Sequence, residues 1–242
     1  MYSIIIATYN SANTLAEAIQ SVLQQTLKDF ELIIIDGKSS DGTLEIIKSY
    51  EKEITYWISE KDKGVYDAWN KGIKIAKGEW ICFLGSDDIM LPTTIEKYND
   101  FIITNIDRRF EFISSKIEFV RNNLEKIKVV GEAWNWNTFK KYMNALHPGA
   151  MHHFTFFEKY GKYNIQFNIV DDYEILLRAK DQLRAGFLDE VTIKMRREGI
   201  SDSYKAVYQT MQVKIEHRSR PLILIYWDFI ISFVKFFGRR YL

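Results

Sequence analysis

The sequence predicts an α/β protein in which a mainly parallel central sheet is flanked by helices. Short apolar runs alternate with helical patterns over the first hundred residues, as they do where crossover helices join parallel strands. The fourth run, residues 80–84, is followed at once by Gly85, Ser86 and the adjacent carboxylates of Asp87 and Asp88. A layered fold with polar groups at the carboxyl ends of its strands is therefore expected.

The first strand–helix unit begins close to the N-terminus. Residues 3–10 form an apolar run that breaks into the polar residues Thr8, Tyr9 and Asn10. A helical pattern follows and ends at Leu23, with its apolar positions three and four residues apart.

Two further strands precede the acidic pair. Residues 30–35 predict the second strand, with Asp36 at its end and Asp41 as the N-cap of the next helix. Residues 54–58 predict the third strand, and a helix is expected over residues 65–76. After Pro92 the pattern predicts a helix to about Thr104, and residues 110–120 and 127–130 predict a hairpin.

Parallel strands place all these strand ends at one edge of the sheet, where ligands bind in open α/β folds. Carboxylates there suit a hard divalent cation that carries a ligand's phosphates. The structural alternative is an Asp-Asp turn in which Asp88 caps the following helix. No Gly-x-Gly-x-x-Gly follows the first strand and no P-loop is present, so the usual phosphate cradles are missing.

Composition narrows the class of protein. The 242 residues are 47% hydrophobic, enough for one large core or two modest ones. With 33 basic and 32 acidic residues, the net charge of +1 gives no field that favours nucleic acid as a partner. Cys82 is the single cysteine, which excludes an intramolecular disulfide and fits a reducing cytoplasm. The N-terminus has no signal-peptide pattern, so a cytoplasmic location is expected.

Four segments, residues 7–10, 35–43, 59–72 and 83–88, occur in an order and spacing that resembles the family 2 glycosyltransferases. The resemblance covers roughly residues 1–205 and implies the GT-A fold, a Rossmann-like arrangement for nucleotide-diphospho-sugars. It implies nucleotide contacts from Thr8, Tyr9, Asn10, Asp36, Asp62, Lys63, Gly64, Asp67, Asn70 and Asp87. Asp88, assisted by Asp87, would hold Mn or Mg. Two positions depart from the family pattern, Gly37 in place of a second Asp and Gly85 in place of a polar or acidic residue.

The same resemblance divides the chain. Residues 1–100 would bind the nucleotide-sugar, residues 101–205 the acceptor, and residues 206–242 would form a helical tail. On the acceptor side, Trp134 is either a sugar-stacking platform or a core anchor. His152 precedes an expected apolar strand and is either a pocket residue or a structural histidine; His153 would face the opposite side, so the two cannot easily share a metal.

Asp171 and Asp172 open a predicted helix, where the dipole favours carboxylates whatever their function. The resemblance makes Asp172 the catalytic base of an inverting transfer, with Asp171 beside it, and the dipole is expected to lower the pKa of Asp172. Residues 195–201 resemble the family's Gly-Gly-Ile-Ser loop, in which Arg196 or Arg197 would reach the diphosphate; the resemblance also places Arg196 with Trp134 and His152 on the acceptor side.

The tail differs in kind. Residues 221–237 are apolar except for Asp228, Ser232 and Lys235, and arginines flank the run. The run is too short and too charged for a membrane span. It predicts an amphipathic helix that lies in a membrane interface, or else one packed on its own domain or in a homodimer.

The sequence therefore predicts a metal-dependent inverting glycosyltransferase that uses a nucleotide-sugar, favoured as a UDP-sugar. Its acceptor would be a saccharide or a lipid-linked glycan in surface polysaccharide synthesis, at the inner face of the plasma membrane. The alternatives are a non-catalytic nucleotide-sugar-binding subunit and a nucleotidyltransferase, although residues 7–13 lack the basic side chains that hold a triphosphate.

Overall fold

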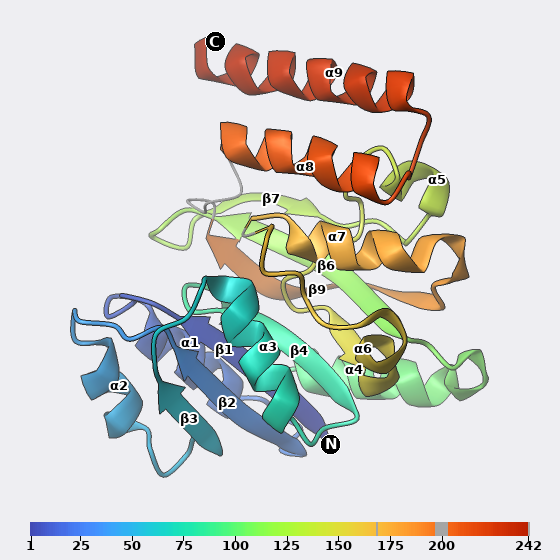
Figure 1. Ribbon diagram of the computed structural model, residues 1–242. Coiled ribbons are helices and arrows are strands. Elements are labelled where there is room, and N and C mark those ends of the chain that lie inside the picture. The colour runs from blue at the N-terminus through green and yellow to red at the C-terminus, as the bar shows by residue number, and fades with distance from the viewer. Residues whose placement is uncertain (168, 197–202, 242) are drawn as a thin grey trace.

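The computed structural model describes residues 1–167, 169–196 and 203–241. Nine strands of these described residues form one mixed sheet in the order β3-β2-β1-β4-β8-β6-β9-β5, with β7 paired to β6 (Figure 1). The predicted α/β architecture with a mainly parallel sheet is confirmed.

The first half has the elements and the order that the sequence predicts. They are β1 (Tyr2–Thr8), α1 (Leu15–Leu23), β2 (Phe30–Asp36), α2 (Thr43–Ser49), β3 (Tyr56–Ser59), α3 (Val65–Ile75) and β4 (Trp80–Gly85). The four strands are parallel to one another. Strand β1 is an unbroken apolar run because both of its faces are buried; Ile4, Ile5 and Ile6 are fully inaccessible.

The second half adds antiparallel strands to this sheet. Its elements are β5 (Ile89–Met90), α4 (Thr94–Thr104), β6 (Phe112–Val120), β7 (Lys126–Val130), α5 (Trp136–Phe139), β8 (Met151–His153), α6 (Phe154–Tyr160), α7 (Asp171–Ala179) and β9 (Ala185–Arg196). The expected hairpin is the antiparallel pair β6–β7. Strand β8 lies between β4 and β6 and is antiparallel to both, whereas β9 runs parallel to β6.

Two local predictions and one structural alternative are wrong. The apolar residues after His152 form helix α6 rather than a strand, because the side chain of His153 accepts a hydrogen bond from the Thr155 N–H and caps the helix. Asp88 does not cap α4, since β5 intervenes. The N-cap of α2 is Gly42, at φ 101°, although the Asp41 carboxylate still accepts from the Thr43 N–H at 3.1 Å.

The core consists of one apolar cluster on each face of the sheet. Helices α1, α2 and α4 supply the cluster that includes Leu15, Ile47 and Tyr98. Helices α3, α6 and α7 supply the other, which includes Tyr66 and Phe156. Each face of the sheet is thereby covered by helices, as parallel strands require.

Two helices follow β9, α8 (Tyr204–Glu216) and α9 (Leu222–Tyr241). Ala206 and Val213 of α8 are buried in the cluster with α7, and α9 lies outside α8, farthest from the sheet (Figure 1). Within the part of the chain that the structure describes, no helix combines the length and apolarity that crossing a membrane needs.

Candidate active site

The strand ends meet at one edge, as the sequence predicts. Thr8 is in register with Asp36, Asp36 with Ser59, and Ala7 with Gly85. The polar segments that follow β1, β2, β3 and β4 therefore begin side by side.

A pocket of about 450 Å³ opens at this edge. Its lining comes from Ala7, Thr8, Tyr9, Gly37, Lys61, Asp62, Gly64, Val65 and Ala68. The Tyr9 ring is 64% exposed, whereas Thr8 is buried and its Oγ1 has no hydrogen-bond partner among the described residues. A buried polar atom without a partner at the wall of a pocket is available to a ligand.

Gly37 explains how Asp62 enters this pocket. A Cβ at position 37 would lie 2.7 Å from Asp62 Oδ2 and 3.3 Å from the Tyr9 ring, so a larger residue would displace one of them. Asp62 Oδ1 also accepts from the Gly64 N–H at 2.9 Å, which fixes the carboxylate at the start of α3. The departure from the family pattern at Gly37 thus leaves space for the Asp62 carboxylate, which follows β3.

Other expected nucleotide residues are already engaged within the protein. Asp36 is fully buried, and its carboxylate accepts from the Ser39 N–H at 3.0 Å and from the hydroxyls of Ser39 and Ser59 at 2.5 Å each. The Asn70 amide donates to the Tyr163 carbonyl at 2.8 Å and accepts from the Tyr163 N–H at 3.0 Å. The structure therefore gives Asp36 and Asn70 supporting positions outside the pocket lining.

Asn10, Lys63 and Asp67 also lie outside the lining of this pocket. Asn10 Oδ1 accepts from the Ser40 N–H at 3.0 Å and joins the segments after β1 and β2. The Lys63 N–H donates to Asp67 Oδ2 at 3.0 Å in the first turn of α3. These contacts shape the loops that surround the pocket.

The turn after β4 carries the paired carboxylates. Asp88 is 4% exposed and Asp87 is partly exposed. Their oxygens fold over Gly85, where an added Cβ would lie 2.7 Å from Asp88 Oδ2 and 2.9 Å from Asp87 Oδ1. Burial, and then the Asp87 charge, raise the pKa of Asp88 to about 8.

This pair fits a divalent cation. It offers hard oxygen donors only, and two like charges held together gain from a cation between them. The described residues contain no group of three or more His, Cys, Asp or Glu side chains that could hold a metal. Further ligands would therefore come from water and from the phosphates of a bound molecule, which is how Mg²⁺ is usually bound beside nucleotides.

Arg196 lies behind the acidic turn rather than on the acceptor side. Its guanidinium donates to the Asp87 carbonyl and, at 2.5 Å, to Glu17 Oε2 of α1. The side chain is 7% exposed and holds the turn in place from the end of β9. Arg197 and residues 198–201, where the sequence predicts the rest of this loop, lie outside the described residues.

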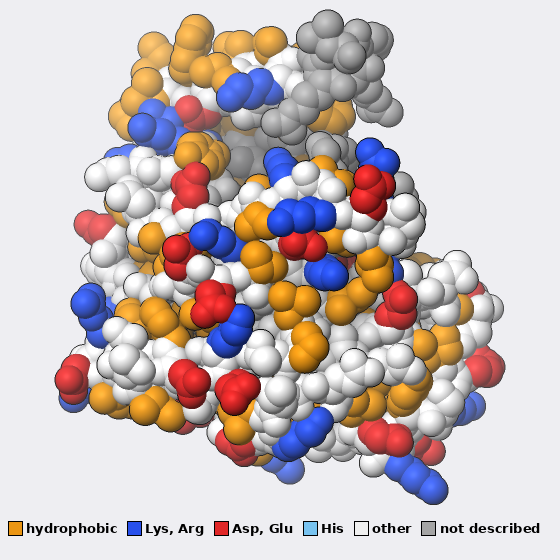
Figure 2. Space-filling model, turned by 180° about the vertical axis from the view of Figure 1, so that it is seen from behind, with side chains coloured by type: hydrophobic (Ala, Val, Ile, Leu, Met, Phe, Trp, Pro, Cys, Tyr) orange, Lys and Arg blue, Asp and Glu red, His pale blue; other side chains and the backbone are white. Residues whose placement is uncertain are grey.

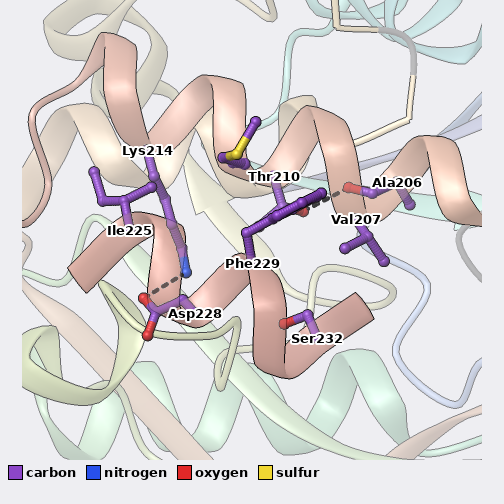
Figure 3. A pocket seen from close by; sticks show the side chains of 9 residues that line it. Ala206, Val207, Thr210, Lys214, Ile225, Asp228, Phe229 and Ser232 are labelled. Carbon is purple, nitrogen blue, oxygen red and sulfur yellow. Dashed lines mark hydrogen bonds and ion pairs between the residues drawn. The ribbon is translucent and has the colours of Figure 1, made fainter. Parts of the chain in front are cut away.

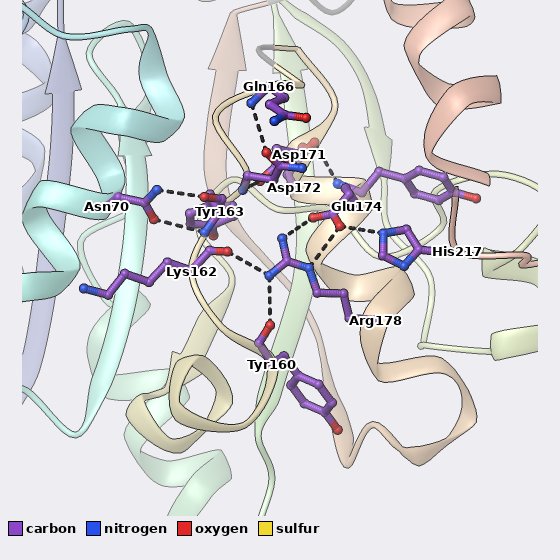
Figure 4. Close-up of polar contacts among 12 residues, drawn as sticks. Asn70, Tyr160, Lys162, Tyr163, Gln166, Asp171, Asp172, Glu174, Arg178 and His217 are labelled. Carbon is purple, nitrogen blue, oxygen red and sulfur yellow. Dashed lines mark hydrogen bonds and ion pairs between the residues drawn. The ribbon is translucent and has the colours of Figure 1, made fainter. Parts of the chain in front are cut away.

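Asp171 and Asp172 have different surroundings, although they are adjacent (Figure 4). Asp172 is partly exposed, and its Oδ1 accepts from the Tyr66 hydroxyl of α3 at 3.1 Å and from the Tyr173 N–H at 2.9 Å. Asp171 is fully buried and accepts from the Asn164 N–H. Since Val65 and Ala68 of α3 line the pocket, the Tyr66 bond joins Asp172 to the helix that borders it.

The pKa of Asp172 shifts opposite to expectation. Burial raises it to about 6, and the hydrogen bonds from Tyr173 and Tyr66 only partly offset that rise. Desolvation outweighs the helix dipole here. Burial and then the Glu174 carboxylate also raise the pKa of Asp171, which favours its protonated form.

Sequence reasoning missed the residues that hold α7. Glu174 accepts from Arg178 Nε at 3.0 Å and from His217 Nε2 at 2.5 Å, and Arg178 also donates to the Tyr160 and Lys162 carbonyls at 2.8 Å each (Figure 4). The spacing of Glu174 and Arg178, four residues apart on a helix, was a signal for their ion pair. Nothing in the sequence pointed to His217 or to the Tyr66 hydroxyl.

His152 and Trp134 occupy apolar surroundings. His152 is fully buried among the rings of Phe83, Phe112 and Phe157, and burial lowers its pKa to about 3. It is a structural histidine in the core rather than a residue of the pocket wall. The half-buried Trp134 ring packs against Phe139 with 4.4 Å between centroids, which favours the core-anchor alternative.

The family follows from the sequence match over residues 3–163, which fits the model described as Glycosyl transferase family 2. The chain belongs to this family. A PGL/p-HBAD biosynthesis glycosyltransferase of Mycobacterium bovis (strain BCG / Pasteur 1173P2) is 29% identical over 182 residues, covering 74% of this chain and 69% of the relative. The Escherichia coli enzyme UDP-Glc:alpha-D-GlcNAc-diphosphoundecaprenol beta-1,3-glucosyltransferase WfgD is 33% identical over 124 residues, 51% of this chain and 48% of that protein.

Solved structures agree on the fold of this family 2 chain. S. aureus TarS 1-349 in complex with UDP-GlcNAc superposes with a TM-score of 0.73 at 20% identity, over 89% of this chain and 65% of that one. The mannosyltransferase PcManGT from Pyrobaculum calidifontis, in complex with GDP-Man and Mn²⁺, gives 0.67 at 16% identity, over 91% and 64%. The GT-A fold is thus shown, and this chain spans less than two thirds of either structure.

Proposed function

We propose that this chain is a metal-dependent inverting glycosyltransferase that moves a sugar from a UDP-sugar to a hydroxyl group of a saccharide or lipid-linked acceptor. One observation carries the proposal. The pocket at the strand ends and the partly exposed Asp172 are joined through α3 and the Tyr66 hydroxyl, and a carboxylate pair follows β4 at the same sheet edge. The family membership makes sugar transfer a better fit than nucleotidyl transfer.

The donor would enter the pocket of about 450 Å³. The exposed Tyr9 ring offers a flat surface for the base, and the Thr8 hydroxyl offers an unused hydrogen-bonding group. The Asp62 carboxylate, held beside Gly37, would accept from the nucleoside, and the backbone at Gly64 would border it. Residues 1–100 supply all of these groups.

Asp88, with Asp87, would hold Mn or Mg. The cation would neutralise charge on the leaving diphosphate. The structure of PcManGT with GDP-Man and Mn²⁺ supports a metal of this kind in the same fold.

Asp172 would accept the proton of the acceptor hydroxyl. As that proton moves to the carboxylate, the acceptor oxygen forms its bond to the anomeric carbon and the bond to the diphosphate breaks on the opposite face. One displacement without an enzyme nucleophile inverts the configuration. The Tyr66 hydroxyl would hold the carboxylate in position, and residues 101–205 would form the acceptor side.

The acceptor class rests on the relatives. WfgD is named for a diphosphoundecaprenol acceptor, and the Mycobacterium bovis relative for PGL/p-HBAD biosynthesis. We therefore propose a surface glycan or a lipid-linked glycan at the inner face of the plasma membrane as the acceptor of this chain.

A thermal-shift screen of UDP-, GDP-, CMP- and dTDP-sugars with Mn tests the donor. We expect stabilisation by a UDP-sugar in wild type, and a loss of at least tenfold in its affinity for Asp62→Asn, because one charged acceptor is removed from the pocket. Asp107→Asn, an exposed acid in the turn just after α4 and outside the pocket lining, is the matched control and should bind as wild type does. Stabilisation by none of the four classes would refute the proposed donor site.

The pH dependence of the proposed sugar transfer follows from the pKa of Asp172. A base must be ionised, and burial raises the pKa of this carboxyl to about 6. We therefore expect kcat/KM to fall tenfold per pH unit below about pH 6 and to level off above it. The profile should be measured with a saturating cation, so that protonation of Asp88 does not limit the rate. A profile that is flat down to pH 5 would place the base elsewhere.

A further inference from the structure

Helix α9 exposes most of its apolar residues to solvent, whereas its one acidic residue, Asp228, faces the protein. Asp228, Ile225, Phe229 and Ser232 line the seam with α8, together with residues of that helix (Figure 3). The exposed side is almost wholly apolar, and its members are Leu222, Ile223, Leu224, Tyr226, Trp227, Ile230, Ile231, Phe233 and Val234. This is the reverse of a helix that packs on its own domain by an apolar stripe.

The geometry of a helix makes this surface broad. At about 100° per residue, the exposed apolar positions cover an arc of roughly 200°, and the residues in the seam lie opposite its centre. Tyr204 of α8 is also exposed and extends the same surface, because its ring lies 5.9 Å from the Phe233 ring of α9, measured between centroids. Figure 2 shows apolar side chains gathered over this outer helix at the top of the molecule.

An ionic cluster fixes the orientation. Asp228 accepts from Lys214 Nζ at 3.1 Å and from Arg220 Nη1 at 2.5 Å, and Lys214 also donates to the Lys141 carbonyl. Lys214 is 3% exposed, so turning α9 to bury its apolar side would strip this cation of its carboxylate partner. The apolar face is thus held outward by the fold itself.

We propose that this apolar face of α9, with Tyr204, docks in the interface of an anionic lipid bilayer. Three features favour lipid over a second copy of the chain. The arc of roughly 200° is wider than one packed helix covers, and tyrosine and tryptophan rings suit the boundary between headgroups and acyl chains. The third feature is charge: Arg218, just before α9, and Lys235, near the edge of the apolar arc, are exposed cations.

The docked helix lies in the interface and does not cross it. No described helix is long and apolar enough to span a bilayer, and α9 is tied along its seam to α8. Lys235 lies near the edge of the apolar arc, where its ammonium group can reach the headgroups. Docking does not depend on the proposed donor chemistry, because the pocket and α9 are on different elements.

Cosedimentation of the full chain with vesicles tests the proposal. We expect wild type to bind phosphatidylcholine vesicles that contain phosphatidylglycerol at least tenfold more tightly than vesicles of phosphatidylcholine alone. The double substitution Ile223→Glu/Ile230→Glu should weaken binding to the anionic vesicles at least tenfold. These side chains are 78% and 51% exposed, so the fold should survive the change.

The matched control is Ile103→Glu/Ile106→Glu, two isoleucines in α4 and just after it that are 62% and 66% exposed; α4 lies away from α9 (Figure 1). This variant should bind vesicles as wild type does. Vesicle binding equal in both double variants would refute the proposal, and so would a wild type that stays in the supernatant. Light scattering would show whether the α9 substitutions instead dissociate a dimer, which would assign the face to a second copy. UDP binding should persist in every variant, so a failure there would count against the proposed function alone.

Discussion

Replacing Asp172 by Asn is expected to lower sugar transfer by on the order of 10²–10⁴ while UDP-sugar affinity stays within a few-fold, because a positioned base contributes about that much. The amide keeps an oxygen that can accept from the Tyr66 hydroxyl and from the Tyr173 N–H. It also removes a carboxylate whose ionised form is disfavoured by burial, so the variant should melt no lower than wild type above pH 6. Turnover and melting temperature, measured on the same preparation, separate loss of chemistry from loss of fold.

Asp171→Asn is the matched control for this experiment. Burial and the Glu174 carboxylate already favour the protonated form of Asp171, and an amide resembles that form in charge and shape. Transfer by this variant should stay within a few-fold of wild type. If it is the inactive one of the two, the base is Asp171, and if neither loses activity, the base lies outside α7.

Replacing Asp88 by Asn is expected to abolish the gain in UDP affinity that Mn gives and to lower transfer at least ~10²-fold, since a metal on the leaving group contributes several kcal/mol. The two carboxylates folded over Gly85 would become one, and the remaining charge would hold a cation poorly. Calorimetry of UDP binding with and without Mn measures the effect directly, without need of an acceptor.

The Asp88→Asn variant should fold as stably as wild type. Burial and the Asp87 charge raise the pKa of Asp88 to about 8, so the native side chain is itself neutral at pH 7 without a cation. Asp107→Asn should leave the Mn-dependent gain unchanged. UDP binding that Mn enhances equally in wild type and in Asp88→Asn would remove the acidic turn from the metal proposal.

The sequence predicted most of the first half of the fold because its strands are buried on both faces. A run such as Ile4, Ile5 and Ile6 is typical of a strand buried on both faces, and the polar breaks then mark one sheet edge. Residues 154–157 were wrongly predicted as a strand. Their aromatic side chains favour a strand by propensity, whereas a cap from His153 and burial of Phe156 and Phe157 produce a helix.

The sequence could not separate pocket-lining residues from supporting residues, because the hydrogen-bond partners of the supporting residues lie far away in the chain. Asp36 meets Ser59 only across the β2–β3 pair, and Asn70 meets Tyr163 only once the second half has folded. The direction in which the pKa of Asp172 shifts was predicted wrongly, because a helix dipole can be inferred from sequence but the desolvation of the carboxylate cannot. The orientation of α9 could not be predicted either, because no sequence pattern indicated that Lys214 and Arg220 bind Asp228.

The three-residue strand β8 has a consequence for the order in which the chain can fold during synthesis. Strand β4 ends at Gly85, and its second neighbour in the sheet is not made until Met151–His153 has emerged. In that interval β1 covers one side of β4, while the N–H and C=O groups of the other side have no strand to bond. A nascent chain that stalls between these points presents a ready template to a second chain, and aggregation of such fragments is the expected outcome.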